Sequence, residues 1–212
     1  MQSLFVFGLG LVVKLFLLLT PFFVLSVFVS SCDGMENQLR KKLALRTGIS
    51  VISACVVLYL FGEIIFDCLG ISLNAFRIGA GLVLMLNGID MVRSSLPKNR
   101  SLDESGDPAV VPLAIPTTVG PGTIGTLLVM GASCAERAAA AGFSRWIFLV
   151  IEVCAVILSC IGVAVMLFFS EGLNRIFKDK GVRILSKLTG MYIVALAAQI
   201  IFDGVRGFLN IH

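Results

Sequence analysis

Three long stretches of this chain contain no charged residue. They run from Leu15 to Cys32, from Ala109 to Ala135 and from Val153 to Ser170. A helix that crosses the hydrocarbon core of a membrane needs about 20 predominantly apolar residues. The runs are continuous rather than alternating, which excludes the strands of an outer-membrane barrel. The sequence therefore predicts an all-α polytopic membrane protein.

The composition excludes several other classes of protein. Of the 212 residues, 58% are hydrophobic and 14% are charged, whereas soluble domains have about 45–50% apolar and about 25% charged residues. This balance excludes a disordered chain, a nucleic-acid-binding domain and a soluble globular enzyme. The only histidine is His212, and the six cysteines form no CxxC motif. We therefore expect no enzymatic activity, no cofactor and no metal site.

The apolar residues divide into six predicted transmembrane segments. The first is expected to be a retained helix, because Met1 to Val13 contains no Lys or Arg and the apolar run is about twice too long for a signal peptide. The segments are at about 4–30, 47–66, 73–92, 110–133, 146–169 and 187–207.

The positive charges indicate the orientation. Six spans place the connections 31–46, 93–109 and 170–186 on one side, and this side, with Lys187 at its boundary, holds twelve Lys and Arg residues. Because Lys and Arg are enriched in cytoplasmic loops, these connections are predicted to be cytoplasmic and both termini to face outward. The cationic residues assigned to the opposite side are Arg137, Arg145 and Arg206, with Arg77 just inside the third segment.

A six-span chain divides into two three-span halves, which must insert in opposite orientations because three is odd. Asp90 precedes Arg93 at the end of the third segment, and Asp203 precedes Arg206 with the same spacing at the end of the sixth. The predicted organisation is a first three-helix repeat at 1–95, a cytoplasmic linker at 96–109 and a second, inverted repeat at 110–212.

The first and fourth segments are predicted to be interrupted helices. The first contains Thr20-Pro21, and the fourth contains three prolines and two glycines within eleven residues. Proline lacks an N–H group and clashes with the preceding turn, and non-helical backbone at membrane depth must face protein or water. Paired interruptions of this kind indicate a transporter binding site; the alternative is a kink used only for packing. The predicted substrate-binding residues are Thr20, Pro21, Pro116, Thr117, Thr118, Gly120, Pro121, Gly122 and Thr123.

Ionisable residues inside the membrane are also functional candidates. Glu152 lies about two turns inside the fifth segment and is the candidate for proton coupling, since burial of a carboxyl group favours its neutral form. The alternatives are that it faces the interface or pairs with Arg77 or Lys14. Lys14 itself either borders the cavity or extends to the outer surface. The residues expected to have structural polar roles are Lys14, Arg77, Asn87, Asp90, Gln199 and Asp203.

Several motifs resemble those of the MarC family of integral membrane proteins. The most specific is Val111–Ile124 (VPLAIPTTVGPGTI). Further similarities are found at Gly8–Val13, Gly70–Leu73, Phe76–Gly81 and Gln199–Gly204, so the resemblance covers essentially the whole chain. It implies a multi-pass protein of the bacterial inner membrane, built from inverted three-helix repeats with discontinuous first and fourth helices. Some relatives are described as neutral amino acid transporters.

The first segment departs from the pattern of those transporter-like relatives, which is Asn/Asp-Pro-x-Gly-Asn-x-Pro. Here Thr20–Ser26 reads TPFFVLS, without the Gly, the Asn and the second Pro. Two hypotheses follow: a secondary transporter or exporter of a small metabolite such as a neutral amino acid, or a non-transporting membrane scaffold or stress-linked subunit. The expected partners are the lipid bilayer and a small-molecule solute, without nucleic acid; a homo-oligomer is compatible with the sequence.

Overall fold

The structure, a computed structural model, describes residues 2–32, 35–93 and 119–209. All regular secondary structure within these residues is α-helical. The helices are α1 (Gln2–Leu18), α2 (Pro21–Ser31), α3 (Asn37–Leu69), α4 (Leu73–Arg93), α5 (Pro121–Ala132), α6 (Cys134–Ala140), α7 (Arg145–Phe168) and α8 (Ser170–Leu209).

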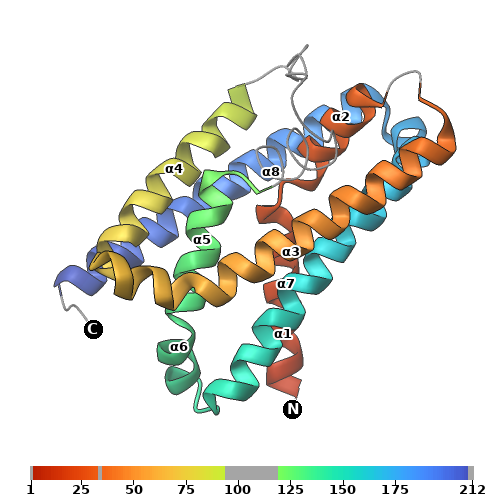
Figure 1. The fold of residues 1–212 in the computed structure, drawn as a ribbon. Helices are drawn as coiled ribbons and strands as arrows, with labels where there is room; N and C mark the ends of the chain where they lie inside the picture. The colour runs from red at the N-terminus through yellow and green to blue at the C-terminus, as the bar shows by residue number, and fades with distance from the viewer. Residues whose placement is uncertain (1, 33–34, 94–118, 210–212) are drawn as a thin grey trace.

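The helices pack around a core where α1, α3, α5 and α7 meet. Leu15 and Leu18 from α1, Cys55 from α3, Leu127 from α5 and Val156 from α7 are each at most 4% exposed. The short helix α5 lies in the middle of the bundle, with α4 along α8 on one side and α3 beside α7 on the other (Figure 1).

The described helices form four full-length membrane spans, or five if the bent pair α1–α2 is counted as one. The predicted segments 47–66, 73–92, 146–169 and 187–207 each coincide with one of the four, and segment 4–30 coincides with α1–α2. The first part of segment 110–133 lies outside the described residues, and the rest forms α5, which has 12 residues. The chain is therefore a multi-pass membrane protein, and the sixth span stays a prediction.

The connections that are rich in Lys and Arg lie toward one end of the bundle. The α2–α3 connection, the end of α4 at Arg93 and the α7–α8 junction lie at the top and right of Figure 1. The N-terminus, α6, the α3–α4 turn and the C-terminus lie toward the opposite end. This arrangement matches the two groups of connections into which the charges divide the sequence.

Glycines hold α5 close to its neighbours on two sides. A Cβ atom added at Gly125 would lie 2.6 Å from the Cβ of Ala80 in α4, and one added at Gly131 would overlap the carbonyl oxygen of Tyr59 in α3. Small residues let helix backbones approach closely in membranes. These contacts fix α5 between α3 and α4 and so determine where its first turn points.

Candidate functional site

The first span is broken where the sequence predicts it. Helix α1 ends at Leu18, Thr20 adopts left-handed backbone angles (φ 50°, ψ 52°), and Pro21 begins α2. The two helix axes differ in direction by 42°. Pro21 has no N–H group to donate to the preceding turn, and the carbonyl of Leu17 accepts instead from the N–H of Thr20 at 3.0 Å. The oxygen of Leu18 lies 3.5 Å from the hydroxyl of Thr123, which donates a long hydrogen bond to it.

Helix α5 starts opposite this break. Gly120 has an extended backbone (φ −68°, ψ 170°), and Pro121 is the first helical residue. The first N–H groups of a helix have no acceptor within the helix, so the positive end of α5 begins here. The hydroxyl of Thr126 donates to the carbonyl of Gly122 at 2.8 Å, and Thr123 turns toward α1.

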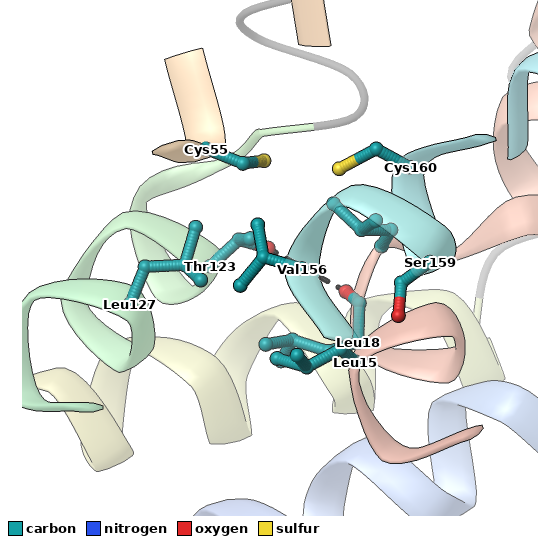
Figure 2. A pocket seen from close by; sticks show the side chains of 9 residues that line it. Leu15, Leu18, Cys55, Thr123, Leu127, Val156, Ser159 and Cys160 are labelled. Carbon is teal, nitrogen blue, oxygen red and sulfur yellow. Dashed lines mark hydrogen bonds between the residues drawn. The ribbon is translucent and has the colours of Figure 1, made fainter. Parts of the chain in front are cut away.

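A small cavity lies between the α1–α2 break and the first turns of α5, and Figure 2 shows it from close by. Its volume leaves room for about one water molecule. Nine residues line it: Leu15, Leu18 and Leu19 from α1, Cys55 from α3, Thr123 and Leu127 from α5, and Val156, Ser159 and Cys160 from α7. The cavity thus joins both predicted interrupted segments.

Two hydroxyls at the cavity hold the backbone of α1. The hydroxyl of Thr123 contacts the Leu18 carbonyl. The hydroxyl of Ser159 lies 2.9 Å from the carbonyl of Val12 and 2.7 Å from that of Ala155 in its own helix. In Figure 2 the sulfur atoms of Cys55 and Cys160 point toward each other. Helices α5 and α7 therefore each place one hydroxyl against a backbone carbonyl of α1.

A charged cluster lies one helical turn from the cavity. The carboxylate of Glu152 in α7 is buried, at 1% exposure. It accepts a hydrogen bond from the Tyr59 hydroxyl at 2.6 Å and three from Arg137, two from Nη2 at 2.8 Å and one from Nε at 3.1 Å. Arg137 also donates to the Ser133 hydroxyl and to the carbonyl of Met130. The cluster connects α3, α5, α6 and α7.

The structure brings only some of the predicted site residues together. Thr123 lines the cavity, and Thr20 and Pro21 form the adjacent break. Gly122 packs instead on α4, where an added Cβ would lie 2.9 Å from the Cα of Leu84. Gly120 and Pro121 form the start of α5. The remaining three, Pro116, Thr117 and Thr118, lie outside the described residues.

The predicted polar residues lie at several separate places. Lys14 is half-buried on α1, within electrostatic range of Asp203 and Arg137. Arg77 donates to the Asn74 side chain at 3.0 Å and pairs with Glu136 at 3.5 Å. Asn87 is half-buried on α4, and the exposed residues are Asp90, Gln199 and Asp203. The partner of Glu152 is Arg137, rather than Arg77 or Lys14.

Sequence reasoning missed Tyr59, Arg137 and Ser159. Arg137 was assigned to a connection because its neighbours are not hydrophobic enough to extend a span. Tyr59 carried a usable signal, because a tyrosine in an apolar run usually finds a hydrogen-bond partner for its hydroxyl. Ser159 carried a weaker one, since serine in a membrane helix commonly bonds to its own or a neighbouring helix.

Comparisons with known proteins identify the family. The chain matches the MarC family of integral membrane proteins over residues 5–209. It is 32% identical over 204 residues to a UPF0056 membrane protein of Methanocaldococcus jannaschii, covering 92% of this chain and 94% of the relative. It is 29% identical over 209 residues to the UPF0056 inner membrane protein MarC of Escherichia coli, covering 93% of each chain. No solved structure matches the chain. The resemblance in the sequence motifs is thus confirmed, and the chain belongs to the MarC family of integral membrane proteins.

Proposed function

We propose that the chain is a secondary transporter or exporter of a small metabolite, such as a neutral amino acid, and that the cavity is its substrate site in a closed state. The observation that carries the proposal is the meeting of the α1–α2 break and the start of α5 at one cavity, where Thr123 of α5 reaches the Leu18 carbonyl of α1. Interrupted helices supply carbonyl oxygens and N–H groups to a substrate without requiring a charged side chain. A zwitterion needs both kinds of partner, because its ammonium group donates to carbonyl oxygens and its carboxylate accepts from N–H groups.

The packing of the helices supports an inverted repeat of residues 1–95 and 110–212, joined by the linker 96–109. Helix α3 packs on α5 as α7 packs on α1, and α4 packs on α5 as α8 packs on α2. The pairs α3–α7 and α4–α8 also pack on each other. Exchanging α1–α2 with α5, α3 with α7 and α4 with α8 reproduces this set of contacts. Rocking of such repeats against each other provides alternating access.

We further propose that the protein lies in the bacterial inner membrane, with its termini outside, and acts without a cofactor. The Escherichia coli relative is named an inner membrane protein. In this proposal Glu152 couples transport to protons, because its carboxylate lies one turn from the cavity-lining Val156. Protonation would remove the charge that pairs with Arg137.

Uptake by purified protein in proteoliposomes tests the proposal. A panel of radiolabelled neutral amino acids and other small zwitterions should include at least one that accumulates above empty liposomes. Thr123→Val keeps the shape of the side chain but removes its hydroxyl. Uptake should fall by up to about tenfold, because the free energy of one hydrogen bond corresponds to a factor of that size. Ser26→Ala is the matched control: this half-buried serine of α2 is not among the cavity-lining residues, and its uptake should stay near the original level.

The other outcomes are informative. Full uptake by Thr123→Val, with loss in Ser26→Ala, would move the site into α2. Failure of every solute to accumulate would favour the alternative function, a non-transporting membrane scaffold or stress-linked subunit. The departure of Thr20–Ser26 from the motif of transporter-like relatives is the observation on the side of that alternative.

A further inference from the structure

We propose that α6 is a lid over the cavity, locked shut by the contacts of Glu152 with Arg137 and Tyr59, and that solute reaches the cavity from the α6 end when this lock opens. The proposal rests on the proposed function insofar as the cavity takes a solute. The lid itself is a property of the fold and does not depend on which solute that is.

The lock forms the next layer of the bundle beyond the cavity. Tyr59 lies four residues after the cavity-lining Cys55 on α3, and Glu152 lies four residues before the cavity-lining Val156 on α7. Four residues are about one helical turn, or about 6 Å along the axis. Because α3 and α7 are antiparallel here (Figure 1), both steps lead toward the same end of the bundle, the end that carries α6.

Helix α6 is separated from its neighbours by a break at each end. Ser133 leaves helical geometry between α5 and α6, with φ −91° and ψ 9°. Gly142, in the turn before α7, has φ 72°, a backbone conformation that glycine reaches without strain. A seven-residue helix between two such joints can move as a unit while α5 and α7 stay in place.

Apolar packing alone attaches α6 weakly. Its buried residues are Cys134 and Ala138, which pack with Phe148 of α7, whereas Ala135 and Ala139 are exposed. Two small side chains bury little apolar area. The polar contacts of Arg137 with Glu152, Ser133 and Met130 therefore supply much of the attachment.

The lock is also reversible on electrostatic grounds. A buried carboxylate needs a counter-charge or water, and Glu152 at 1% exposure has Arg137 as its ion-pair partner. The Arg137 side chain is 34% exposed, so other parts of the protein leave its outer side uncovered. When α6 swings outward, water enters to solvate both groups, and the cavity becomes continuous with the solution on this side.

The native thiols Cys55 and Cys160 are built-in reporters of this opening. Both are 1% exposed and both line the cavity, whereas Cys68, at the end of α3, is exposed. The full chain, expressed in intact cells and in inside-out membrane vesicles, is treated with a membrane-impermeant maleimide. The labelled fraction of each cysteine is then measured by peptide mass spectrometry, with Cys68 as the internal reference.

Breaking the lock should expose these thiols from the α6 side only. We expect Arg137→Gln and Glu152→Gln each to raise the labelling rate of Cys55 and Cys160 by about tenfold or more, as the loss of hydrogen bonds to a charged group predicts. The matched control is Glu136→Gln, at the position next to Arg137. This substitution removes the ion pair between Glu136 and Arg77, in which the Glu136 side chain is 70% exposed. Its labelling rate should stay within about twofold of the original.

A milder variant keeps the test valid if the charge variants fold poorly. Tyr59→Phe preserves the packing of α3 and removes one hydrogen bond to Glu152, so it should raise the labelling rate by a smaller factor. Unchanged labelling in all three lock variants, or an equal rise in Glu136→Gln, would overturn the lid. The labelling experiment needs no substrate. Absence of transport in the uptake experiment would therefore not contradict the lid, and failure of the lid proposal would not contradict the uptake result.

Discussion

The pairing of Glu152 with Arg137 follows from the cost of burying a charge. A carboxylate removed from water is stabilised only by good ion-pair and hydrogen-bond geometry. Glu152 obtains both, from a guanidinium with two nitrogens within 3.1 Å and from the Tyr59 hydroxyl. Arg137 reaches inward from the rim on a long side chain, which is why an arginine counted among the outer connections neutralises a glutamate inside the bundle.

At the same scale, Gly131 should tolerate no side chain. A Cβ there would overlap the backbone carbonyl of Tyr59, and a helix backbone cannot retreat as a flexible side chain can. Gly131→Ala should therefore push α5 away from α3 and lower stability by about 1–3 kcal/mol, measured as a lower melting temperature of the purified protein in detergent.

Gly79 on α4 is the matched control for this substitution. An added Cβ at this position would meet nothing within 4 Å, and alanine is the better helix former. Gly79→Ala should leave the melting temperature unchanged or raise it slightly. Equal destabilisation by both substitutions would mean that helix flexibility, rather than the approach of α3 to α5, sets the requirement for glycine.

At the scale of the element, the break between α1 and α2 stores backbone strain at Thr20. A β-branched residue with φ 50° lies in a region that such residues rarely occupy. Thr20→Gly should relieve this strain and raise stability by about 0.5–1 kcal/mol after the entropy cost of glycine in the unfolded chain. Thermal unfolding in detergent measures the effect. A fall in the melting temperature would show instead that the Thr20 side chain stabilises the break by more than its backbone costs.

Local sequence chemistry predicted the break of the first span better than the helix lengths. Pro21 has the same effect in any surroundings, so the break of the first span could be placed to the residue. Helix α3 begins at Asn37, about ten residues before the apolar run, and α8 begins at Ser170 rather than near 187. Both helices continue past the hydrocarbon core, where hydropathy no longer marks them.

The site was only partly predictable, because some of its contacts join residues that are far apart in the sequence. Thr123 belongs to a motif whose prolines and glycines are visible in the sequence, and it lines the cavity. The contact between Tyr59 and Glu152 joins residues 93 positions apart, and no local pattern encodes such a distance. Helix α6 has seven residues and no apolar run, so neither periodicity nor hydropathy could reveal the element that carries Arg137.

At the scale of the whole molecule, the distribution of Lys and Arg along the sequence and the packing of the helices distinguish the same two ends of the bundle. The start of α3, the end of α4 and the α7–α8 junction, which are rich in Lys and Arg, lie toward one end of the bundle, although nothing about helix packing requires this. Cationic loops remain on the cytoplasmic side during insertion because translocating them is unfavourable. We therefore expect the bundle to take its orientation in the membrane from residues that contribute little to its core.

This orientation predicts which residues face each side of the membrane. Gln38 is exposed at the start of α3, beside Arg40 to Lys42, and Ser144 is exposed just before α7 at the opposite end of the bundle. Single cysteines placed at these two positions, in a chain whose native cysteines are replaced by alanine or serine, report the two sides. In intact cells a membrane-impermeant maleimide should label Ser144→Cys and not Gln38→Cys, and in inside-out vesicles the result should reverse. Labelling of both from the same side would contradict the crossing of α3 and α7, whereas the opposite pattern at both positions would keep the fold and invert its orientation.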